Sequence, residues 1–569
     1  MDCSEKILSD LYADLIVDFM PPADSGVLRG RRDYCYLPVG NFYLVYVNRA
    51  QTTPFSLGLY AYGNTPNIYG LMENEFDPSS LIASGITQIQ RPPLSLTGRG
   101  VVMAFIDTGI DYTLDIFKDA NGNTRILSIW DQTDQTGTPP EGYLFGSEYT
   151  REQIDEALQN SNPYSIVPSR DELQHGTSMA GVAAGSAIDG GRTYTGAAPE
   201  SDIVVIKLKQ CKPYMRDYYL IPEDVPAYAE NDIMLAVKYA ESFAVAFERP
   251  VVICMGVGTN QGNHAGNSPL ARYLDEVATQ RSQAVVVAGG NEGNAAHHFR
   301  GQLKTGQSDN SNYEDVEIRV GENTRGFFLE LWGSVPDVFN IAIRSPGGET
   351  ISPSKIRSGR SGGTYAFVYE QTKITIDSIL VEQSTGEELI VMRFELPTPG
   401  IWNIRVIAQG EVYSGIFHIW LPIQQFMTGE TYFLEPDPNI TLTEPAYAFS
   451  VITVSTYNDL NNSFYLESGR GFSRTGEIKP DFAAPGVNIS TIYGAMSGSS
   501  LAAAITSGAV AQFMQWAVVQ GNKILVESVE IKSFFIRGAS RDGNLVYPNP
   551  EWGYGRLNLV GTFNTMVEI

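Results

Sequence analysis

Residues 100–111 read GVVMAFIDTGID, an apolar run that ends at a single carboxylate, Asp107. Similar short apolar runs follow along the chain: DIVVIKL at 202–208, PVVICM at 250–255 and QAVVVAGG at 283–290. Helix-like segments such as NDIMLAVKYAESFAVA separate them. Continuous apolar strands that alternate with helices predict an α/β fold, in which a parallel sheet is covered by helices on both faces.

The composition changes on both sides of this pattern. Residues 1–90 mix short alternating segments, such as FYLVYV, with helical stretches and run into the sequence QIQRPPLSLTGRG, so we expect a small α+β module and a polar linker. Residues 301–445 alternate β-branched and aromatic residues between Gly/Pro turns, which predicts an inserted β-sandwich or jelly roll. The α/β pattern resumes with AFSVITVSTY, so the insert divides the α/β domain into residues 91–300 and 446–569.

The chain carries 39 Lys and Arg residues against 64 Asp and Glu residues, a formal net charge of −25. It has no cluster of basic residues that could neutralise a row of phosphates, so we expect no nucleic-acid partner. The N-terminal sequence MDCSEKILSDLYADLIVDFM lacks the basic and apolar regions of a secretory signal, and we find no apolar stretch long enough to span a bilayer. These features predict a protein without a membrane partner, either intracellular or released by a route that the sequence does not display.

Four cysteines, Cys3, Cys35, Cys211 and Cys254, show no close pairing and no metal-ligand spacing. Such sparse usage predicts reduced thiols, with Cys254 as a small buried apolar residue. The sequence lacks the HExxH and CxxC patterns of zinc sites. The stretch DANGNT, at 119–124, lacks the downstream glutamate of a calcium loop and is better interpreted as a hairpin turn, so we expect no required metal and no cofactor.

Two polar residues stand at positions where an α/β fold gathers its active-site groups. Asp107 ends the first apolar run, at the carboxyl edge of the predicted sheet, although a lone aspartate there is also typical of a turn or a helix cap. His175 opens the small-residue segment HGTSMAGVAAGSA and is one of only five histidines. A structural histidine is the default interpretation for any one of them, but nothing in the helix that it begins explains a polar ring there.

A third candidate, Ser500, lies in SGSSLAAAITSGAVAQF, where a glycine turn precedes an alanine-rich helix. Its hydroxyl would sit at the helix N-terminus with backbone N–H groups close by. The alternative is a helix cap, a task for which the neighbouring Ser499 is better placed.

The three blocks together are far more specific than any one of them, because their order Asp, His, Ser and their flanking residues match one arrangement. DTGID (107–111), HGTSMAG (175–181) and GSSLAAA (498–504) resemble the motifs of the subtilisin-like serine proteases, the subtilase family. VAGGNEGN (287–294) and KPDFAAPG (479–486) support the resemblance. It implies a serine endopeptidase with a subtilisin-like fold and with protein or peptide substrates.

The resemblance also implies a role for each matching residue. Asp107, His175 and Ser500 would form the catalytic triad, and the Asn291 side chain would form the oxyanion hole with the backbone N–H of Ser500. The segments that border the cleft in the family would line the substrate pocket here: Met255, Gly256, Val257 and Gly258, and Ala288, Gly289 and Gly290. Gly256 stands where many relatives carry serine, which leaves the depth of the pocket open.

Within the family, the layout is similar to that of the clostridial spore-germination proteases of the Csp type. The similarity rests on an N-terminal segment of propeptide size, on an insert between the asparagine and the serine, and on PPLSLTGRGVVMAFIDTGIDY (92–112). It implies that residues 1–90 act as a folding propeptide that the enzyme cuts and can retain, and that the spore-associated protease activates the precursor of a cortex-lytic enzyme. We expect self-cleavage in the exposed linker, after Gln88 or Gln90.

Two alternatives stay open at this point. Some Csp-type chains have lost triad residues and act as pseudoproteases, so a signalling or scaffolding protein of the same fold is the main alternative, although this chain keeps all three residues. The insert would have a separate function if it bound carbohydrate or another protein. It shows no ligand constellation in the sequence, and we interpret it as a rigidifying element.

Overall fold

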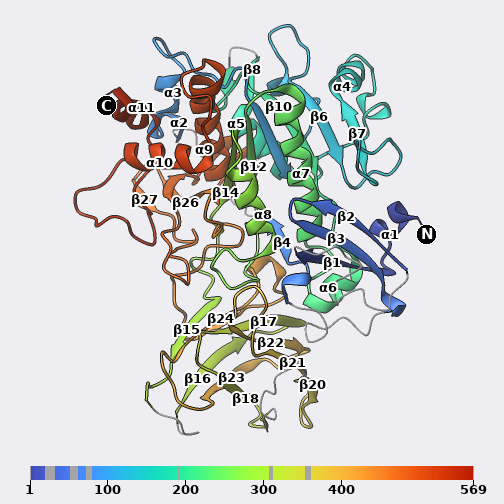
Figure 1. The fold of residues 1–569 in the computed structure, drawn as a ribbon, viewed down its shortest axis with the longest axis vertical. Helices are drawn as coiled ribbons and strands as arrows, with labels where there is room; N and C mark the ends of the chain where they lie inside the picture. The colour runs from blue at the N-terminus through green and yellow to red at the C-terminus, as the bar shows by residue number, and fades with distance from the viewer. Residues whose placement is uncertain are drawn as a thin grey trace.

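A mostly parallel β-sheet forms the centre of the molecule (Figure 1). The computed structural model describes residues 2–18, 33–51, 62–71, 80–189, 192–306, 312–352 and 361–567. In spatial order the sheet contains β27 (Ser463–Phe464), β26 (Ile452–Asn458), β14 (Gln283–Ala288), β12 (Val251–Met255), β5 (Val102–Asp107), β10 (Asp202–Lys207), β6 (Ile126–Asp131) and β7 (Ser147–Thr150), and β28 (Phe482–Pro485) also pairs with β26. The pairings from β28 to β6 are parallel, whereas the short strands β27 and β7 are antiparallel to their neighbours.

Helices cover both faces of this sheet. Alternate residues of β5 point to opposite faces, because Met103 and Phe105 belong to one apolar cluster and Ala104 and Ile106 to another. The first cluster includes residues of α3 (Ile86–Ile89), α4 (Arg151–Leu158), α5 (His175–Ala184), α9 (Ser499–Met514), α10 (Ser528–Gly538) and α11 (Leu559–Val567), and the second includes residues of α7 (Glu230–Phe247) and α8 (Pro269–Ala278). The predicted fold class, an α/β sheet with helices on both faces, is confirmed.

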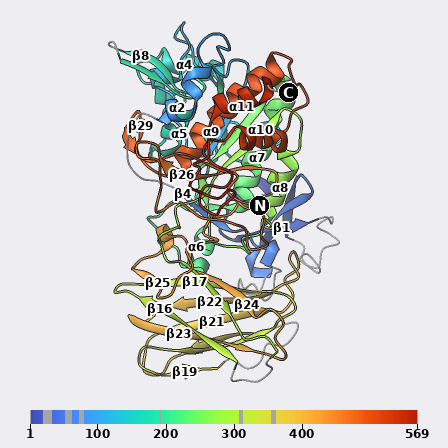
Figure 2. The same cartoon turned by 90° about the vertical axis from the view of Figure 1, so that its left-hand side faces the viewer.

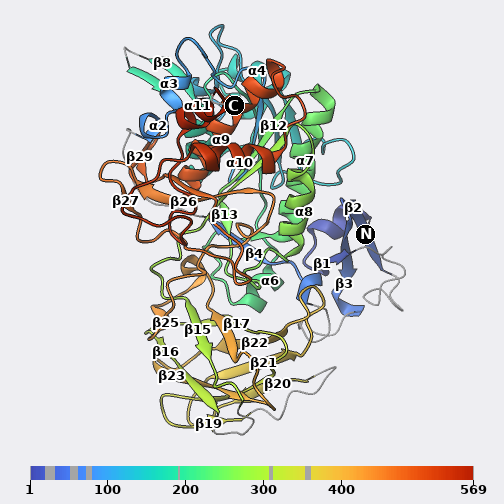
Figure 3. The ribbon, with the colours of Figure 1, turned by 60° about the vertical axis from the view of Figure 1, so that its left-hand side comes forward.

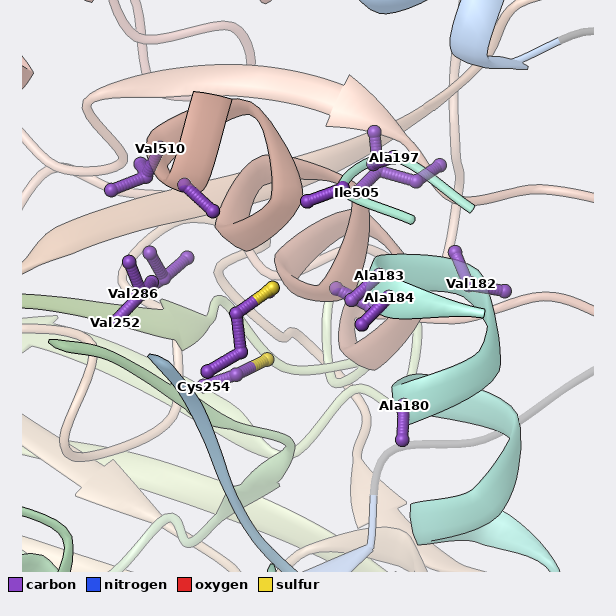
Figure 4. Packing of buried hydrophobic residues seen from close by; sticks show 14 of the residues in the cluster. Ala180, Val182, Ala183, Ala184, Ala197, Val252, Cys254, Val286, Ile505 and Val510 are labelled. Atoms are coloured by element: carbon purple, nitrogen blue, oxygen red, sulfur yellow. The ribbon is translucent and has the colours of Figure 1, made fainter. Parts of the chain in front are cut away.

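The helices α5 and α9 pack closely on each other and on the sheet. Figure 4 shows alanines of α5 beside Ile505 of α9, with Val252, Cys254 and Val286 of the sheet next to them. A Cβ added to Gly508 of α9 would lie 2.2 Å from the Ala197 Cβ. The small residues of both helices therefore bring two helix N-termini to the same edge of the sheet.

The N-terminal residues form a separate small sheet beside α7 and α8. It combines α1 (Cys3–Leu8) with β1 (Tyr12–Asp18), β3 (Phe42–Asn48) and β2 (Tyr34–Val39), which pair in that order and antiparallel. We call α1 and β1 to β3 the N-terminal module. Lys238 of α7 donates a hydrogen bond to Pro38 O at 2.7 Å, and Arg272 of α8 pairs with Asp18. The module is thus anchored on the second face of the central sheet.

The cysteines differ in part from expectation. Cys3 and Cys35 form a disulfide with their Cα atoms 5.6 Å apart, so the prediction of reduced thiols is wrong for this pair. The fold of α1 against β2 brings together two cysteines that are 32 residues apart, a spacing that carries no motif. Cys211 and Cys254 are free and buried, as predicted for Cys254.

Residues 298–433 form two antiparallel sheets that lie below the α/β domain in Figures 1 and 2. One sheet has the order β15 (His298–Gln302), β24 (Ile416–Trp420), β17 (Gly326–Gly333), β22 (Glu388–Glu395), β21 (Lys373–Ile379) and β20 (Ser361–Ala366). The other has the order β19 (Thr350–Ile351), β18 (Phe339–Arg344), β23 (Gly400–Ala408), β16 (Tyr313–Val320) and β25 (Thr431–Phe433). One apolar cluster joins the two sheets, so the insert is a β-sandwich.

One helical segment in the described part of the chain, Ser499–Val519, has the length and apolar composition needed to cross a bilayer. This finding corrects the prediction that no such stretch exists. The segment is nevertheless 83% buried over its most apolar window, because α9 packs against α5 and against the strands β12, β14 and β26. Its apolar character is explained by its position in the core of the fold.

Candidate active site

Three polar side chains meet at the carboxyl edge of the central sheet. Asp107 is the last residue of β5, His175 is the first residue of α5, and Ser500 is the second residue of α9. The His175 Nδ1 lies 2.6 Å from Asp107 Oδ1, and the His175 Nε2 lies 3.1 Å from Ser500 Oγ. The sequence-predicted trio therefore forms one continuous chain of hydrogen bonds.

The position of His175 depends on a residue that the sequence analysis did not single out. Asp171 Oδ1 accepts hydrogen bonds from Thr108 Oγ1 at 2.7 Å and from the Gln174 N–H at 2.9 Å. Its other oxygen accepts from the N–H and the hydroxyl of Thr177, at 2.8 and 2.6 Å. Asp171 thereby links the loop after β5 to the first turn of α5, and it fixes Asp107 and His175 relative to each other.

The start of α9 fits against the end of β12. Gly498, the N-cap residue, has φ 150°, a backbone conformation that glycine adopts far more readily than other residues. It lets α9 begin so that Ser500 Oγ lies 3.2 Å from Gly256 O as well as 3.1 Å from His175 Nε2. Ser500 is only 1% exposed.

Asn291 lies next to the same helix start. Its Oδ1 accepts a hydrogen bond from the Ser499 N–H at 3.1 Å, which leaves the Nδ2 group of the amide to donate elsewhere. The Ser499 hydroxyl accepts from the Gly290 N–H at 3.0 Å and does not cap the helix, in contrast to the alternative considered from the sequence. Ser499 thus ties the asparagine loop to the helix that carries Ser500.

The predicted pocket segments border a narrow slot. The pocket residues Met255 to Gly258 lie at the end of β12 and in β13 (Val257–Gly258), and Ala288 to Gly290 follow along the end of β14. Thr443, which the sequence analysis missed, lies between these segments: its Oγ1 would be 2.3 Å from a Cβ on Gly258 and 2.6 Å from one on Gly290. Thr443 therefore fills the space between the two predicted pocket segments.

Met179 explains why position 256 carries glycine, where many relatives carry serine. A Cβ on Gly256 would lie 2.5 Å from Met179 Sδ and 3.0 Å from His175 Cε1. The Met179 side chain of α5 thus occupies the room that a serine side chain at position 256 would need. The glycine is the residue that fits beside a methionine at this place.

A strand from the N-terminal part of the chain occupies the cleft. The strand β4 (Ile68–Leu71) lies between β11 (Tyr228–Ala229) and β13 and pairs antiparallel with both. Gly70 is opposite Gly258 and Leu71 is opposite Val257, so the C-terminal end of β4 points toward Gly256 and Ser500. Figure 3 shows β4 and β13 together at the level where the α/β domain meets the insert. An extended peptide substrate would lie in the same way.

Two buried acids flank β4. Burial raises the pKa of Glu230 to about 7 and the pKa of Glu444 to about 8. Glu230 holds the chain before β4, because its carboxylate accepts from the Asn67 N–H at 3.0 Å and its own N–H donates to Asn67 O. The raised pKa values favour neutral carboxyl groups next to the apolar strand.

The structure does not support the predicted linker cleavage. Residues 86–89 form the short helix α3, and Ile86 and Ile89 are buried. The Gln90 side chain donates to Gly196 O and Ala197 O, both at 3.0 Å, and Ala197 O also accepts from Gln512. Gln512 lies 12 residues after Ser500 on α9, a distance of ~18 Å along a helix. Gln88 and Gln90 are therefore far from Ser500, although Gln88 and residues 91–93 are exposed, as expected for this linker.

Within the described ranges, no group of three or more His, Cys, Asp or Glu side chains is arranged to hold a metal ion. The DANGNT segment is a turn in which Asp119 Oδ1 accepts from the N–H groups of Asn121 and Asn123, at 2.8 and 3.0 Å.

Comparison with known proteins identifies the family. The model of the subtilase family matches residues 98–324 and 428–555. The solved structure of the CspB protease of Clostridium perfringens is 32% identical and has a TM-score of 0.75, with 87% of this chain and 100% of that chain covered. The structure of MycP1 without its N-terminal propeptide is 14% identical with a TM-score of 0.38, over 85% of this chain and 97% of that one.

A curated relative, the PII-type proteinase of Lacticaseibacillus paracasei, is 22% identical over 480 residues. The match covers 76% of this chain and only 23% of that much longer protein. The family match covers both parts of the α/β domain, including the segments that carry Asp107, His175, Asn291 and Ser500. The chain belongs to the subtilase family of serine peptidases.

Proposed function

We propose that the protein is a serine endopeptidase that works through Asp107, His175 and Ser500. The observation that carries this proposal is the unbroken hydrogen-bond chain from Asp107 Oδ1 through His175 to Ser500 Oγ. Ser500 Oγ attacks the carbonyl carbon of a peptide bond, and its proton passes to His175 Nε2. Asp107, 1% exposed, stabilises the resulting imidazolium.

The tetrahedral intermediate carries its negative charge on the former carbonyl oxygen. The Asn291 Nδ2 group and the Ser500 N–H in the first turn of α9 donate hydrogen bonds to this oxygen. When the intermediate collapses, the C–N bond breaks and His175 gives its proton to the leaving amine. Water then attacks the acyl-enzyme with His175 as the base and restores Ser500.

The same site would cut the N-terminal part of its own chain. The support for this step is the strand β4, which lies in the cleft with its C-terminal end directed toward Ser500. We place the processing site after Leu71, within residues 72–79, and no longer after Gln88 or Gln90. The residues up to Leu71 then act as the propeptide and occupy the cleft until they leave.

A cut propeptide would stay bound, because buried charges join the N-terminal module to the α/β domain. Asp14 of β1 pairs with Lys212 Nζ at 2.5 Å, and both side chains are almost fully buried. The Tyr214 hydroxyl accepts from the Asp14 N–H at 2.8 Å, and Asn231 donates to Asp14 Oδ2 at 3.3 Å. Separation would break these contacts and expose the apolar residues that the module buries against α7 and α8, such as Ile16, Phe42 and Leu44.

The test combines hydrolysis with intact-mass analysis of the purified full chain. The wild type is expected to appear as two fragments that co-purify, with the cut between residues 72 and 79, and to digest an unfolded protein once the N-terminal fragment has been displaced from the cleft. The Ser500→Ala chain is expected to stay whole and inactive. A wild type that remains uncut and inactive, while the mutant looks the same, would contradict the proposal.

A physiological substrate is proposed from the similarity to the Csp-type proteases. In this proposal the enzyme activates the precursor of a cortex-lytic enzyme during spore germination. The measurement is cleavage of such a precursor by the wild-type chain beside the Ser500→Ala chain. If unrelated unfolded proteins are cut readily and the precursor is not cut, this role is wrong although the protease assignment stands.

A further inference from the structure

The inserted β-sandwich contributes directly to the cleft that holds β4. The two faces of β4 have different neighbours, as expected for an extended strand. Tyr69 and Leu71 belong to the apolar cluster of the α/β domain. Ile68 belongs to another cluster, which also contains Trp420, Ile423 and Phe426 from the end of the insert. The insert thus lies over the face of β4 that points away from the α/β domain.

The insert comes closest to β4 at Gly70. A Cβ on Gly70 would lie 2.6 Å from Ile423 Cδ1, 3.0 Å from Gln425 Oε1 and 3.3 Å from Phe426 Cε1. Contacts under 3.0 Å require a neighbour to move. Gly70 is the residue opposite Gly258 on β13, so its backbone position is fixed by the strand pairing. The segment 423–426 thereby forms a roof above this one position.

Side chains next to the active site hold this roof in place. Asn260, two residues after β13, donates to Leu421 O at 3.1 Å. Glu292, the residue after Asn291, accepts from the Gln424 N–H at 2.9 Å. The two anchors lie on the two walls of the cleft, so the roof is fixed relative to the residues that bind the substrate backbone.

We infer that the insert determines substrate specificity: its segment 423–426 favours glycine as the residue opposite Gly258, because a larger residue would have to displace the Ile423 side chain. The preferred substrate is an extended peptide with the pattern of β4, in which glycine lies between an aromatic and an aliphatic residue, as in Ile68–Leu71. This inference rests on the proposed protease function and adds the class of peptide to it. It also gives the insert a role in recognition in place of the purely rigidifying role expected from its sequence.

Cleavage of peptides with the sequence NIYXLMENEFDPS, taken from residues 67–79 with X in place of Gly70, tests the inference. We expect the self-processed wild type, after displacement of its N-terminal fragment, to cut the glycine peptide with kcat/KM about tenfold or more above the alanine peptide, and the valine peptide still less. In the Ile423→Ala chain the difference between glycine and alanine should fall below about threefold. The control is Val368→Ala, an exposed position of the insert 81% accessible to solvent, which should behave as the wild type.

A second measurement does not depend on peptide cleavage. In the Ser500→Ala chain, Gly70→Val should speed hydrogen exchange of the β4 amides, and Ile423→Ala added to it should restore protection. Equal cleavage of the three peptides, discrimination unchanged in Ile423→Ala, or unchanged exchange in Gly70→Val would each overturn the inference. Labelling by a fluorophosphonate separates the two proposals: an unlabelled Ser500 contradicts the protease function, whereas a labelled Ser500 without discrimination contradicts the inference alone.

Discussion

The hydrogen bond from the Ser499 N–H to Asn291 Oδ1 decides which end of the Asn291 amide is free to act at the nucleophile. Because Asn291 Oδ1 already accepts this hydrogen bond, the Nδ2 group is the end of the amide that can donate to the developing oxyanion. Ser499 also binds the Gly290 N–H through its hydroxyl, so one residue orients the donor from two directions. We therefore expect Asn291 to stabilise the oxyanion electrostatically in the proposed reaction.

Removal of this donor by Asn291→Ala is expected to lower kcat by about 10²–10³, the loss that such a donor causes in a subtilisin, with little change in KM. The measurement is steady-state kinetics on a peptide ester. The exposed Asn294→Ala, three residues further along the same loop, is the control and should retain wild-type kcat. Equal rates in both variants would show that Asn291 is only a turn residue.

Thr443 lies between Gly258 and Gly290, so we expect it to form the floor of the predicted pocket. Its hydroxyl oxygen is buried and has no hydrogen-bond partner among the described residues. Thr443→Gly should therefore open the slot and raise cleavage after large side chains, relative to small ones, by roughly tenfold or more. A peptide library read by mass spectrometry measures this ratio. An unchanged ratio would show that Thr443 does not form the pocket floor.

At the residue scale, the sequence predicted the side chains that stand inside recognisable local motifs. Asp107, His175 and Ser500 each have flanking residues that identify them, and the structure brings the three together. Asp171 and Thr443 could not be predicted in this way. Their importance comes from neighbours that are distant in sequence, such as Thr108 for Asp171 and Gly258 for Thr443.

At the scale of single elements, the contact between α9 and the loop before β10 shows how packing can outweigh helix propensity. Gly508 lies inside α9, where alanine would normally stabilise a helix by about 1 kcal/mol. A Cβ there would be 2.2 Å from Ala197 Cβ and 3.0 Å from Ala183 O. The steric conflict should dominate, because these neighbours are core and backbone atoms.

We therefore expect Gly508→Ala to lower the free energy of unfolding by about 1–3 kcal/mol. Chemical denaturation followed by circular dichroism measures the change. Gly543→Ala, at a glycine with no atom within 4 Å of the added Cβ, serves as the control and should be neutral. A more stable Gly508→Ala chain would mean that propensity, not packing, governs this position.

The strand β4 shows a limit of sequence analysis at this scale. Its four residues, IYGL, are too few for a clear alternation, and both of its partners are two-residue strands far along the chain. The α3 segment shows a related limit: Gln88 is exposed as its polar neighbours suggested, but the anchoring of Ile86 and Ile89 in the core was not predicted. Long apolar strands such as β5 carry their own signal and were predicted correctly.

At the scale of the whole molecule, a stack of aromatic rings joins the α/β domain to the insert. His264 lies parallel to Trp420 of β24 at 4.0 Å between centroids, and His298 Nε2 lies 2.9 Å from His418 Nδ1. Burial lowers the pKa of His264 to about 3 and that of His298 to about 4, and it also lowers the pKa of His418. All three rings are therefore neutral in the folded protein near pH 7.

The expected consequence is a loss of stability in acid. Unfolded histidines bind protons near pH 6.5, whereas the folded His264 and His298 do so only near pH 3 and 4, so their stabilisation is complete above pH 6.5 and declines below it. Each such histidine contributes a slope of about 1.4 kcal/mol per pH unit. His264→Phe keeps the ring stack and should flatten the decline between pH 6.5 and 4. The Trp420→Phe control keeps all three histidines, so its free energy of unfolding should fall with the wild-type slope. If the free energies of unfolding of His264→Phe and wild type showed the same dependence on pH, this account would be wrong.

The overall architecture was largely predictable, whereas the relations between its parts were not. Apolar runs predicted a parallel sheet, and the change in composition predicted a β-rich insert. The Cys3–Cys35 disulfide, the placement of β4 in the cleft and the roof over Gly70 depend on how distant segments dock. Docking is determined by complementary surfaces, which leave no periodic trace in one sequence.

The central claim is that Ser500 is a nucleophile activated by His175. Its most direct test is labelling of the full chain with a fluorophosphonate, followed by mass spectrometry of the modified peptide, in wild type, His175→Ala and Ser500→Ala. We predict a single label on Ser500 in the wild type, a rate of labelling lower by orders of magnitude in His175→Ala, and none in Ser500→Ala. A label on another residue, or equal labelling of all three chains, would contradict the account.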